Sequence, residues 1–423
     1  MSAPRSHATL AIVSMLHGAT HLHWVLLQPL NPEIMTYFGL TQDKQIGLLH
    51  TVFLILYAAS NLVAGILASR FAPRGMLAGG PLLQGACMAA MSLLGPGDFG
   101  WLIALHGLGA AAGGLYHPLA NLLLTTTYPH EKGQALGIAG IGASVAFVAA
   151  PWSASALVHH AGWHWQQVAF ASGCVGMLCG AIAWIGLPAR SCDHEEGLVP
   201  LRPLDAAGAS MRPLWLFVAL VVVVMAGREM GSWGTTASTR QFLDKTFGAQ
   251  APDAGLLLAL LFLPGLIIQP VVGKLSDRMH RELVLGVTML VMAGALVLMS
   301  RVPPGWLWLP YMLLGAAMQA NVPTLEALVA DRAPLRLRGL VFGVMITSGI
   351  AIGSGGPILA GALADAGGRR PEAYAQVFGL LAALCAASAV MCAALRPAAR
   401  ALGLLSVPPP PEAVPAVRGG AGD

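Results

Sequence analysis

Long apolar stretches make up most of the chain, and short segments of proline, glycine and charged residues separate them. A helix that crosses the hydrocarbon core of a bilayer needs about 20 mostly apolar residues. Stretches of this length recur along the whole sequence. The expected spans are 8–30, 46–69, 75–95, 99–127, 134–158, 166–187, 214–240, 253–275, 283–300, 305–330, 338–364 and 374–395. The pattern therefore predicts an all-α membrane protein with twelve transmembrane helices.

The composition agrees with this pattern. Apolar residues make up 56% of the 423 positions, charged residues only 10%, and the mean hydropathy is +0.70. A soluble surface normally carries about 25–35% charged residues. The first apolar run is long enough to span the membrane and contains His17, His21 and His23. It lacks the small-x-small cleavage site of a secretory signal peptide. We therefore expect it to stay in place as the first helix.

The distribution of lysine and arginine predicts the orientation. With both ends in the cytoplasm, the inner loops and tails hold sixteen of the 23 basic residues and the outer loops hold six, while Arg228 lies inside a span. Basic residues collect on the cytoplasmic side of membrane proteins. The net charge of +4 is thus a signal of topology and predicts no nucleic-acid partner. We expect a multi-pass protein of the cell (inner) membrane.

Two parts of the sequence repeat each other at an offset of about 205 residues. The segment 117–137, HPLANLLLTTTYPHEKGQALG, echoes 322–343, VPTLEALVADRAPLRLRGLVFG, with Pro118 matching Pro323 and Pro129 matching Pro334. Internal duplication is common among transporters that place their solute site between two halves. The predicted parts are an N-terminal six-helix bundle (1–187), a cytoplasmic linker (188–213), a C-terminal six-helix bundle (214–395) and a disordered cytoplasmic tail (396–423).

Three loop motifs resemble those of the major facilitator superfamily. The segment 273–282, GKLSDRMHRE, resembles the superfamily's loop signature, and 65–75, GILASRFAPRG, resembles a degenerate copy with Ser69 in place of aspartate. The segment 361–365, GALAD, is similar to a related sequence at the end of the eleventh span. The resemblance implies alternating access between two six-helix halves, with Asp277 and Arg278 as gating residues that latch the halves together.

The fourth span is similar to one branch of that superfamily. The segment 106–121, HGLGAAAGGLYHPLAN, looks like the G-x-G…HP pattern of the fosmidomycin-resistance-like exporters. This resemblance implies that the solute is exported.

Polar side chains on the first, fourth, seventh and tenth spans mark the candidate site, since these spans line the central cavity in the superfamily. Ionisable groups inside a membrane are costly and therefore indicate function. A buried guanidinium favours carboxylate or phosphate groups, which points to an anionic or zwitterionic solute. The candidate solute-binding residues are Arg228, His21, Trp24, His117, Trp233 and Gln319. The candidate proton carriers are His17, His117 and Glu229, because histidine changes charge near neutral pH.

Structural roles are the alternative for several of these residues. Arg228 and Glu229 could be an ion pair that ties helices together, and the histidines could bridge helices by hydrogen bonds. Glu326 lies near the inner end of its span and is expected to pair with Arg332.

Three other functions are alternatives to the transport of an organic solute. Thirteen histidines and eighteen methionines, with H-x-x-x-H at 17–21, leave a transition-metal transporter as the alternative. A histidine-rich membrane enzyme would need its histidines clustered at one membrane face, and here they are spread over both. A sensor that binds without transport is compatible with Ser69. The six cysteines form no C-x-x-C pair and indicate neither a metal nor a redox site.

The sequence therefore predicts a secondary transporter and not an enzyme. We expect its partners to be a small-molecule substrate, protons and the lipid bilayer. We expect no cofactor, and we expect a monomer.

Overall fold

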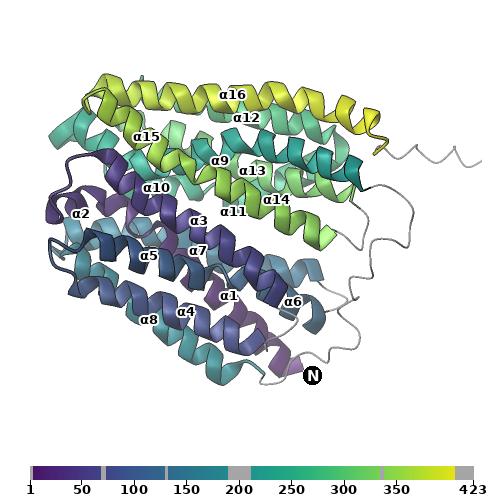
Figure 1. Ribbon diagram of the computed structural model, residues 1–423, viewed down its shortest axis with the longest axis horizontal. Helices are drawn as coiled ribbons and strands as arrows, with labels where there is room; N and C mark the ends of the chain where they lie inside the picture. The colour runs from purple at the N-terminus through teal and green to yellow at the C-terminus, as the bar shows by residue number, and fades with distance from the viewer. Residues whose placement is uncertain (1–2, 68–72, 129–131, 189–210, 334–337, 405–423) are drawn as a thin grey trace, which may run out of the picture.

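The computed structural model describes residues 3–67, 73–128, 132–188, 211–333 and 338–404, and its described elements are all helical (Figure 1). The first half of the chain contains α1 (Ala3–Val25), α2 (Asn31–Tyr37), α3 (Asp43–Leu67), α4 (Pro73–Ala90), α5 (Phe99–Gly113), α6 (Tyr116–Thr127), α7 (Lys132–His159) and α8 (Trp165–Gly186). The second half contains α9 (Arg212–Phe247), α10 (Ala254–Phe262), α11 (Gly265–Arg278), α12 (Arg281–Met299), α13 (Trp308–Ala330), α14 (Arg338–Gly353), α15 (Gly355–Ala366) and α16 (Pro371–Ala401). The predicted all-α class is confirmed.

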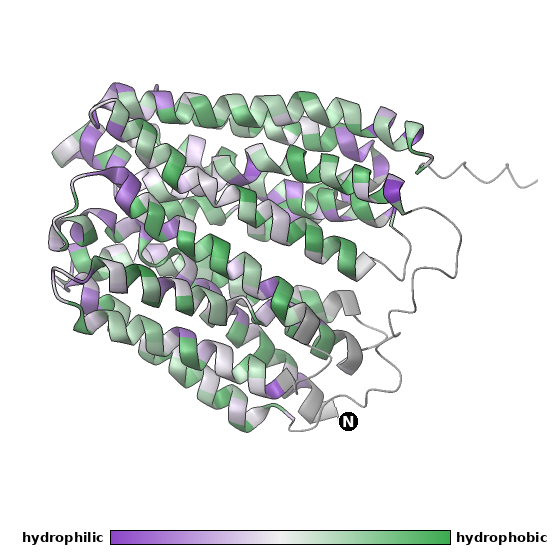
Figure 2. Cartoon of the chain, viewed as in Figure 1, coloured by the Kyte–Doolittle hydropathy of each residue, from purple (hydrophilic) through white to green (hydrophobic). Residues whose placement is uncertain are grey.

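Each of the twelve predicted spans corresponds to one helix or to a broken pair of helices. Among the described residues, ten helical segments are long and apolar enough to cross a membrane. The predicted eighth span is split into α10 and α11 at Leu263–Pro264, as expected of a proline that interrupts a helix. The predicted tenth span is α13, whose polar residues lower its hydropathy. Figure 2 shows apolar residues along the lengths of the helices and hydrophilic residues gathered toward their ends.

The two halves repeat one packing scheme. In the first half α4 packs on α8, α1 on α7 and α3 on α5. The equivalent contacts in the second half are α12 on α16, α9 on α14 and α15, and α11 and α10 on α13. Helices at the same place in each half thus have the same neighbours. This packing agrees with the duplication read from the sequence and places α1, α5–α6, α9 and α13 at equivalent positions.

The halves meet through two symmetry-related helix pairs. In one pair α3 packs against α14 and α15, and in the other α7 packs against α10. Gly47 on α3 lies at the first contact, where a Cβ atom would lie 2.5 Å from the carbonyl oxygen of Pro357 on α15. Gly361 on α15 is its counterpart, since a Cβ atom there would lie 2.6 Å from the carbonyl oxygen of Asp43. Two glycines therefore let the α3 and α15 backbones approach closely.

Polar contacts between the halves gather at the end of the bundle that carries Asp43, here called the Asp43 end. The Asp43 carboxylate pairs with Arg369 at 2.5 Å and accepts a hydrogen bond from the Tyr374 hydroxyl at 2.5 Å. The Asp365 carboxylate accepts hydrogen bonds from the backbone amides of Asp43 and Lys44 at 2.7 and 2.9 Å. Asp43, Asp365, Arg369 and Tyr374 are called the cross-half latch below. The structure is closed at this end, which the lysine and arginine distribution predicts to be outside.

Some predicted boundaries fall on residues that are not described. Most of the predicted linker, residues 189–210, and residues 405–423 of the predicted tail lie outside the described ranges. Helix α16 continues to Ala401, so the first residues of the segment predicted as a disordered tail are helical.

Candidate solute-binding site

Aromatic side chains from both halves meet in the middle of the bundle. Trp24 on α1 stacks on Trp233 on α9, with ring centroids 5.0 Å apart and an interplanar angle of 24°. Phe147 on α7 stacks on Phe262 on α10, with centroids 4.6 Å apart. Tryptophan and phenylalanine faces offer a large apolar area for stacking. These two pairs place ring surfaces where the halves must separate.

A small pocket lies beside the tryptophan pair, on the side of the Asp43 end. The residues that line it come from α1, α3, α9, α15 and the turn after α1, and they include Trp24, Gln28, His50, Phe53, Trp233 and Pro357. Asn31 crosses between the halves nearby: its side-chain amide donates to the carbonyl of Ala237 on α9 at 2.8 Å and accepts from His50 at 3.0 Å. Polar and aromatic groups of both halves thus close the site toward the Asp43 end.

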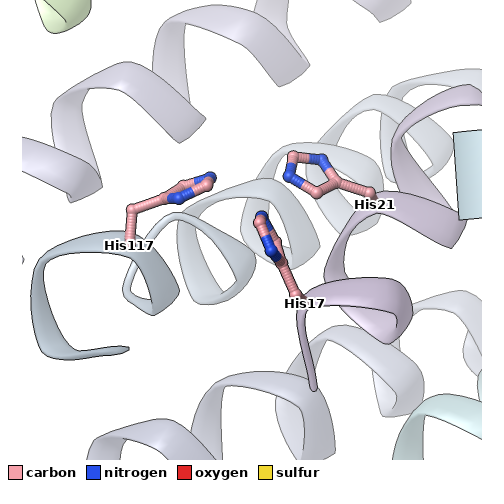
Figure 3. A group of neighbouring side chains, drawn as sticks. All are labelled: His17, His21 and His117. Carbon is pink, nitrogen blue, oxygen red and sulfur yellow. The ribbon is translucent and has the colours of Figure 1, made fainter. Parts of the chain in front are cut away.

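Three histidines of the N-terminal half form a compact cluster (Figure 3). His17 and His21 lie one helical turn apart on α1, and His117 lies on α6. One ring nitrogen of each lies within 4.8 Å of one ring nitrogen of the other two. Figure 3 shows the three rings pointing toward one another. The H-x-x-x-H spacing of His17 and His21 is visible in the sequence, and His117 is one of the predicted site residues. The structure brings all three side chains together.

The ring of His21 connects this cluster to the tryptophan pair. Its centroid lies 5.3 Å from that of Trp24 and 4.6 Å from that of Phe147. Three of the sequence-predicted binding residues, His21, Trp24 and His117, are therefore neighbours of one another or of Trp233.

Arg228 and Glu229 on α9 form an ion pair, and both side chains have further hydrogen-bond partners in this conformation. Arg228 pairs with Glu229 and donates two further hydrogen bonds to the carbonyl of Met318 on α13, at 3.3 and 3.1 Å. The second carboxylate oxygen of Glu229 accepts from the Trp233 indole N–H at 3.0 Å. Both charged side chains are buried. The pair ties α9 to α13 and orients Trp233, and the solute-binding role of Arg228 stays a prediction.

On α13, two predicted residues have different surroundings from those expected. Gln319 is half-buried and packs against Gly265, the first residue of α11. Glu326 is exposed and interacts electrostatically with Arg228. Arg332 instead pairs with Glu282 on α12 at 2.5 Å. The predicted Glu326–Arg332 pair is therefore wrong, because Glu282 offers Arg332 a closer carboxylate.

The predicted gate can be placed only in part. Arg278 is exposed at the last residue of α11. The side chain of Asp277 lies outside the described part of the chain, as does Ser69. The roles of Asp277 and Arg278 as gating residues remain predictions. The cross-half latch at the opposite end was not predicted, although Asp365 ends the GALAD segment noted in the sequence.

Comparison with known proteins relates this sequence to a family. The sequence profile of the Major Facilitator Superfamily matches residues 13–236 and again residues 221–419. Two matches to one profile agree with the duplicated halves. The matched ranges cover almost the whole chain.

Curated relatives include an uncharacterized transporter and several multidrug resistance proteins. The chain is 28% identical over 343 residues to the uncharacterized MFS-type transporter Rv1250 of Mycobacterium tuberculosis, a match over 68% of this chain and 58% of that protein. It is 33% identical over 138 residues to the multidrug resistance protein MdtG of Yersinia enterocolitica, over 33% of this chain and 32% of that protein. The matched part thus spans less than two thirds of the length of either relative.

Solved structures share the fold along nearly their whole length. The crystal structure of a bacterial homolog of the human lysosomal transporter Spinster, in an inward-facing and unoccupied conformation, has a TM-score of 0.75 and 18% identity, covering 95% of this chain and 98% of that one. A nucleoside transporter, NupG, has a TM-score of 0.73 and 13% identity, covering 92% of this chain and 98% of that one.

These relatives and structures lend no support to a transition-metal transporter. The resemblance to the fosmidomycin-resistance-like branch stays a prediction.

Proposed function

Because this chain belongs to the major facilitator superfamily, we propose that it is a secondary transporter that exports a small organic solute by alternating access. Membership in a transporter family also confirms the expectation that the chain is not an enzyme. The observation that carries the proposal is the stacked pair Trp24–Trp233, which joins the two halves in the middle of the bundle. A solute that inserts there contacts both halves, so its binding is coupled to their separation.

The surroundings of the tryptophan pair indicate the class of solute. Trp24, Trp233 and Phe147 supply flat apolar surfaces, which suit a ring or another apolar group. Arg228 lies five residues from Trp233 and carries the positive charge nearest to it along α9. We propose an amphiphilic solute with an anionic or zwitterionic group, which requires Arg228 to exchange part of its contact with Glu229 for the solute. The relative MdtG is named a multidrug resistance protein, which is consistent with export of an organic solute.

Removal of either tryptophan is expected to weaken solute binding by about tenfold or more, since a lost aromatic contact of about 1.4 kcal/mol changes an equilibrium constant by that factor. The variants are Trp24→Ala and Trp233→Ala, and the control is Trp101→Ala, whose side chain is 65% exposed. Purified protein is screened by thermal shift against organic anions and amphiphilic dyes. Efflux of each hit is then measured in proteoliposomes.

This experiment separates the proposal from its alternatives. Loss of binding in both tryptophan variants, with Trp101→Ala unchanged, supports a site between the halves. Wild-type transport in Trp24→Ala and Trp233→Ala would contradict it.

We further propose that the transport is driven by protons. Intramembrane carboxylates mark ion and proton paths, and Glu229 lies next to the tryptophan pair through its hydrogen bond to Trp233. Efflux from proteoliposomes is expected to follow an imposed pH gradient and to stop when a protonophore collapses that gradient. Efflux that continues without a pH gradient but follows a sodium gradient would show that sodium is the coupling ion.

A further inference from the structure

We propose that His17, His21 and His117 form a binding site for one divalent transition-metal ion of the Zn²⁺ type, held within the N-terminal half. The proposal concerns a bound ion and not a transported one, and it does not depend on the proposed function. It rests on the number of ligands, on the hydrogen bonding of the rings and on the packing that holds them.

The ligand set is suited to such an ion. Zn²⁺ binds imidazole nitrogen at about 2.0–2.1 Å and accepts three histidines with a fourth position open to water. Two nitrogens bound to one tetrahedral ion are about 3.4 Å apart at that bond length. The ring nitrogens of the cluster lie within 4.8 Å of one another. Small rotations of the three rings would therefore close the site.

Hydrogen bonding prepares His17 for this role. Its Nδ1 lies 2.9 Å from the carbonyl oxygen of Ala139 on α7, and a carbonyl oxygen only accepts, so Nδ1 carries the proton. The neutral ring then presents the lone pair of Nε2, which is buried and has no hydrogen-bond partner within the described structure. Metal-binding histidines usually donate their other ring nitrogen in this way, to a carbonyl or a carboxylate.

The ring of His21 also has an unpaired nitrogen. Its Nδ1 is also buried without a hydrogen-bond partner among the described residues. A buried polar atom left without a partner costs about 1–3 kcal/mol. A metal ion held between the three rings would satisfy the unpaired Nε2 of His17. His23, on the same helix, also donates one ring nitrogen, Nε2, to a carbonyl, that of Ser172 on α8 at 2.9 Å, but its ring does not belong to the cluster.

Packing restrains the rings without closing the site. Tyr116 stacks on His17 with centroids 4.6 Å apart, and its hydroxyl is fixed by a hydrogen bond to the carbonyl of Val13 at 2.9 Å. Phe147 packs on His21 from the other side. His17 and His117 each keep part of their surface exposed. The three rings are thus held near their binding positions.

The test uses Co²⁺ as a spectroscopic probe on the purified full-length protein. Tetrahedral Co²⁺ gives visible absorption bands that the hexa-aqua ion lacks. We expect these bands at one Co²⁺ per chain, and we expect Zn²⁺ to displace the ion and remove them. The variants His17→Gln and His117→Gln are expected to bind Co²⁺ at least about tenfold more weakly, because each removes one of three ligands.

A matched control excludes binding to surface histidines. His160 is exposed, and His160→Gln is expected to bind as the wild type does. Bands that persist unchanged in the double variant His17→Gln/His117→Gln would overturn the proposal. So would an absence of tetrahedral bands in the wild-type protein, a result that does not depend on any variant being folded.

Discussion

Replacement of Gly47 by leucine is expected to abolish transport while leaving a folded protein. Gly47 packs directly on the α15 backbone, and a Cβ atom at this position would lie 2.5 Å from the Pro357 carbonyl oxygen and 3.1 Å from the Ile358 Cα. Backbone atoms cannot move aside as a flexible side chain does. The two helices belong to different halves, so the clash is relieved when the halves separate at the Asp43 end. The variant is therefore expected to stay open there and to fail to complete the cycle.

Two measurements check this expectation. Efflux in proteoliposomes is compared with that of Gly379→Leu, since a Cβ atom at Gly379 meets nothing within 4 Å. In a background without native cysteines, Gln28→Cys then reports on access from the Asp43 end, because Gln28 is 3% exposed in the closed structure. Gly47→Leu is expected to raise labelling by a membrane-impermeant thiol reagent. Normal efflux in Gly47→Leu would show that α3 and α15 do not need this close contact.

Removal of the Arg228 side chain is expected to destabilise the protein by about 3–5 kcal/mol, which is the usual effect of leaving one member of a buried ion pair without its partner. Arg228→Ala leaves the Glu229 carboxylate buried, and the Trp233 indole N–H is then its one hydrogen-bond donor among the described residues. The double variant Arg228→Ala/Glu229→Gln removes the uncompensated charge. It is expected to recover most of the lost stability in thermal unfolding measured in detergent.

A less buried ion pair serves as the control. Arg240 pairs with Asp244 at 3.3 Å and with Glu33 at 3.7 Å, near the surface of the Asp43 end. Arg240→Ala is expected to change the free energy of unfolding by no more than about 1 kcal/mol. If Arg228→Ala unfolds like the wild type but has lost solute binding, then Arg228 contacts solute and is not needed for packing. If the double variant is stable and still transports, the structural role is the correct one.

The periodicity of the sequence predicted which residues lie in which helix, but it did not predict partners across helices. His17 and His21 share a face of α1 because they are four residues apart, and this spacing is visible in the sequence. The approach of His117 depends on how α6 packs against α1, which no local pattern contains. The break at Pro264 has a local cause, since proline cannot donate the helical hydrogen bond, but Pro151 and Pro323 lie inside continuous helices.

The cross-half latch illustrates the same limit. Asp43 and Arg369 are more than 300 residues apart, and each is simply a charged residue in a short loop beside a predicted span. Their pairing follows from the symmetric docking of the two halves, and the local sequence around either residue does not predict it. Conversely, the sequence resemblance drew attention to Asp277 and Arg278, whose latch role the described residues do not test. Resemblance thus predicted contacts between the halves at one end of the bundle, and the structure shows such contacts at the other end.

The Asp365 carboxylate caps the first turn of a helix that belongs to the other half. It accepts the backbone amides of Asp43 and Lys44, which have no partners within α3 itself. When the halves separate, these amides and both carboxylates of the latch must be hydrated instead. Opening of this end is therefore a hydration reaction, and its equilibrium constant depends on the activity of water. Solutes excluded from the protein surface, which lower that activity, favour the closed form.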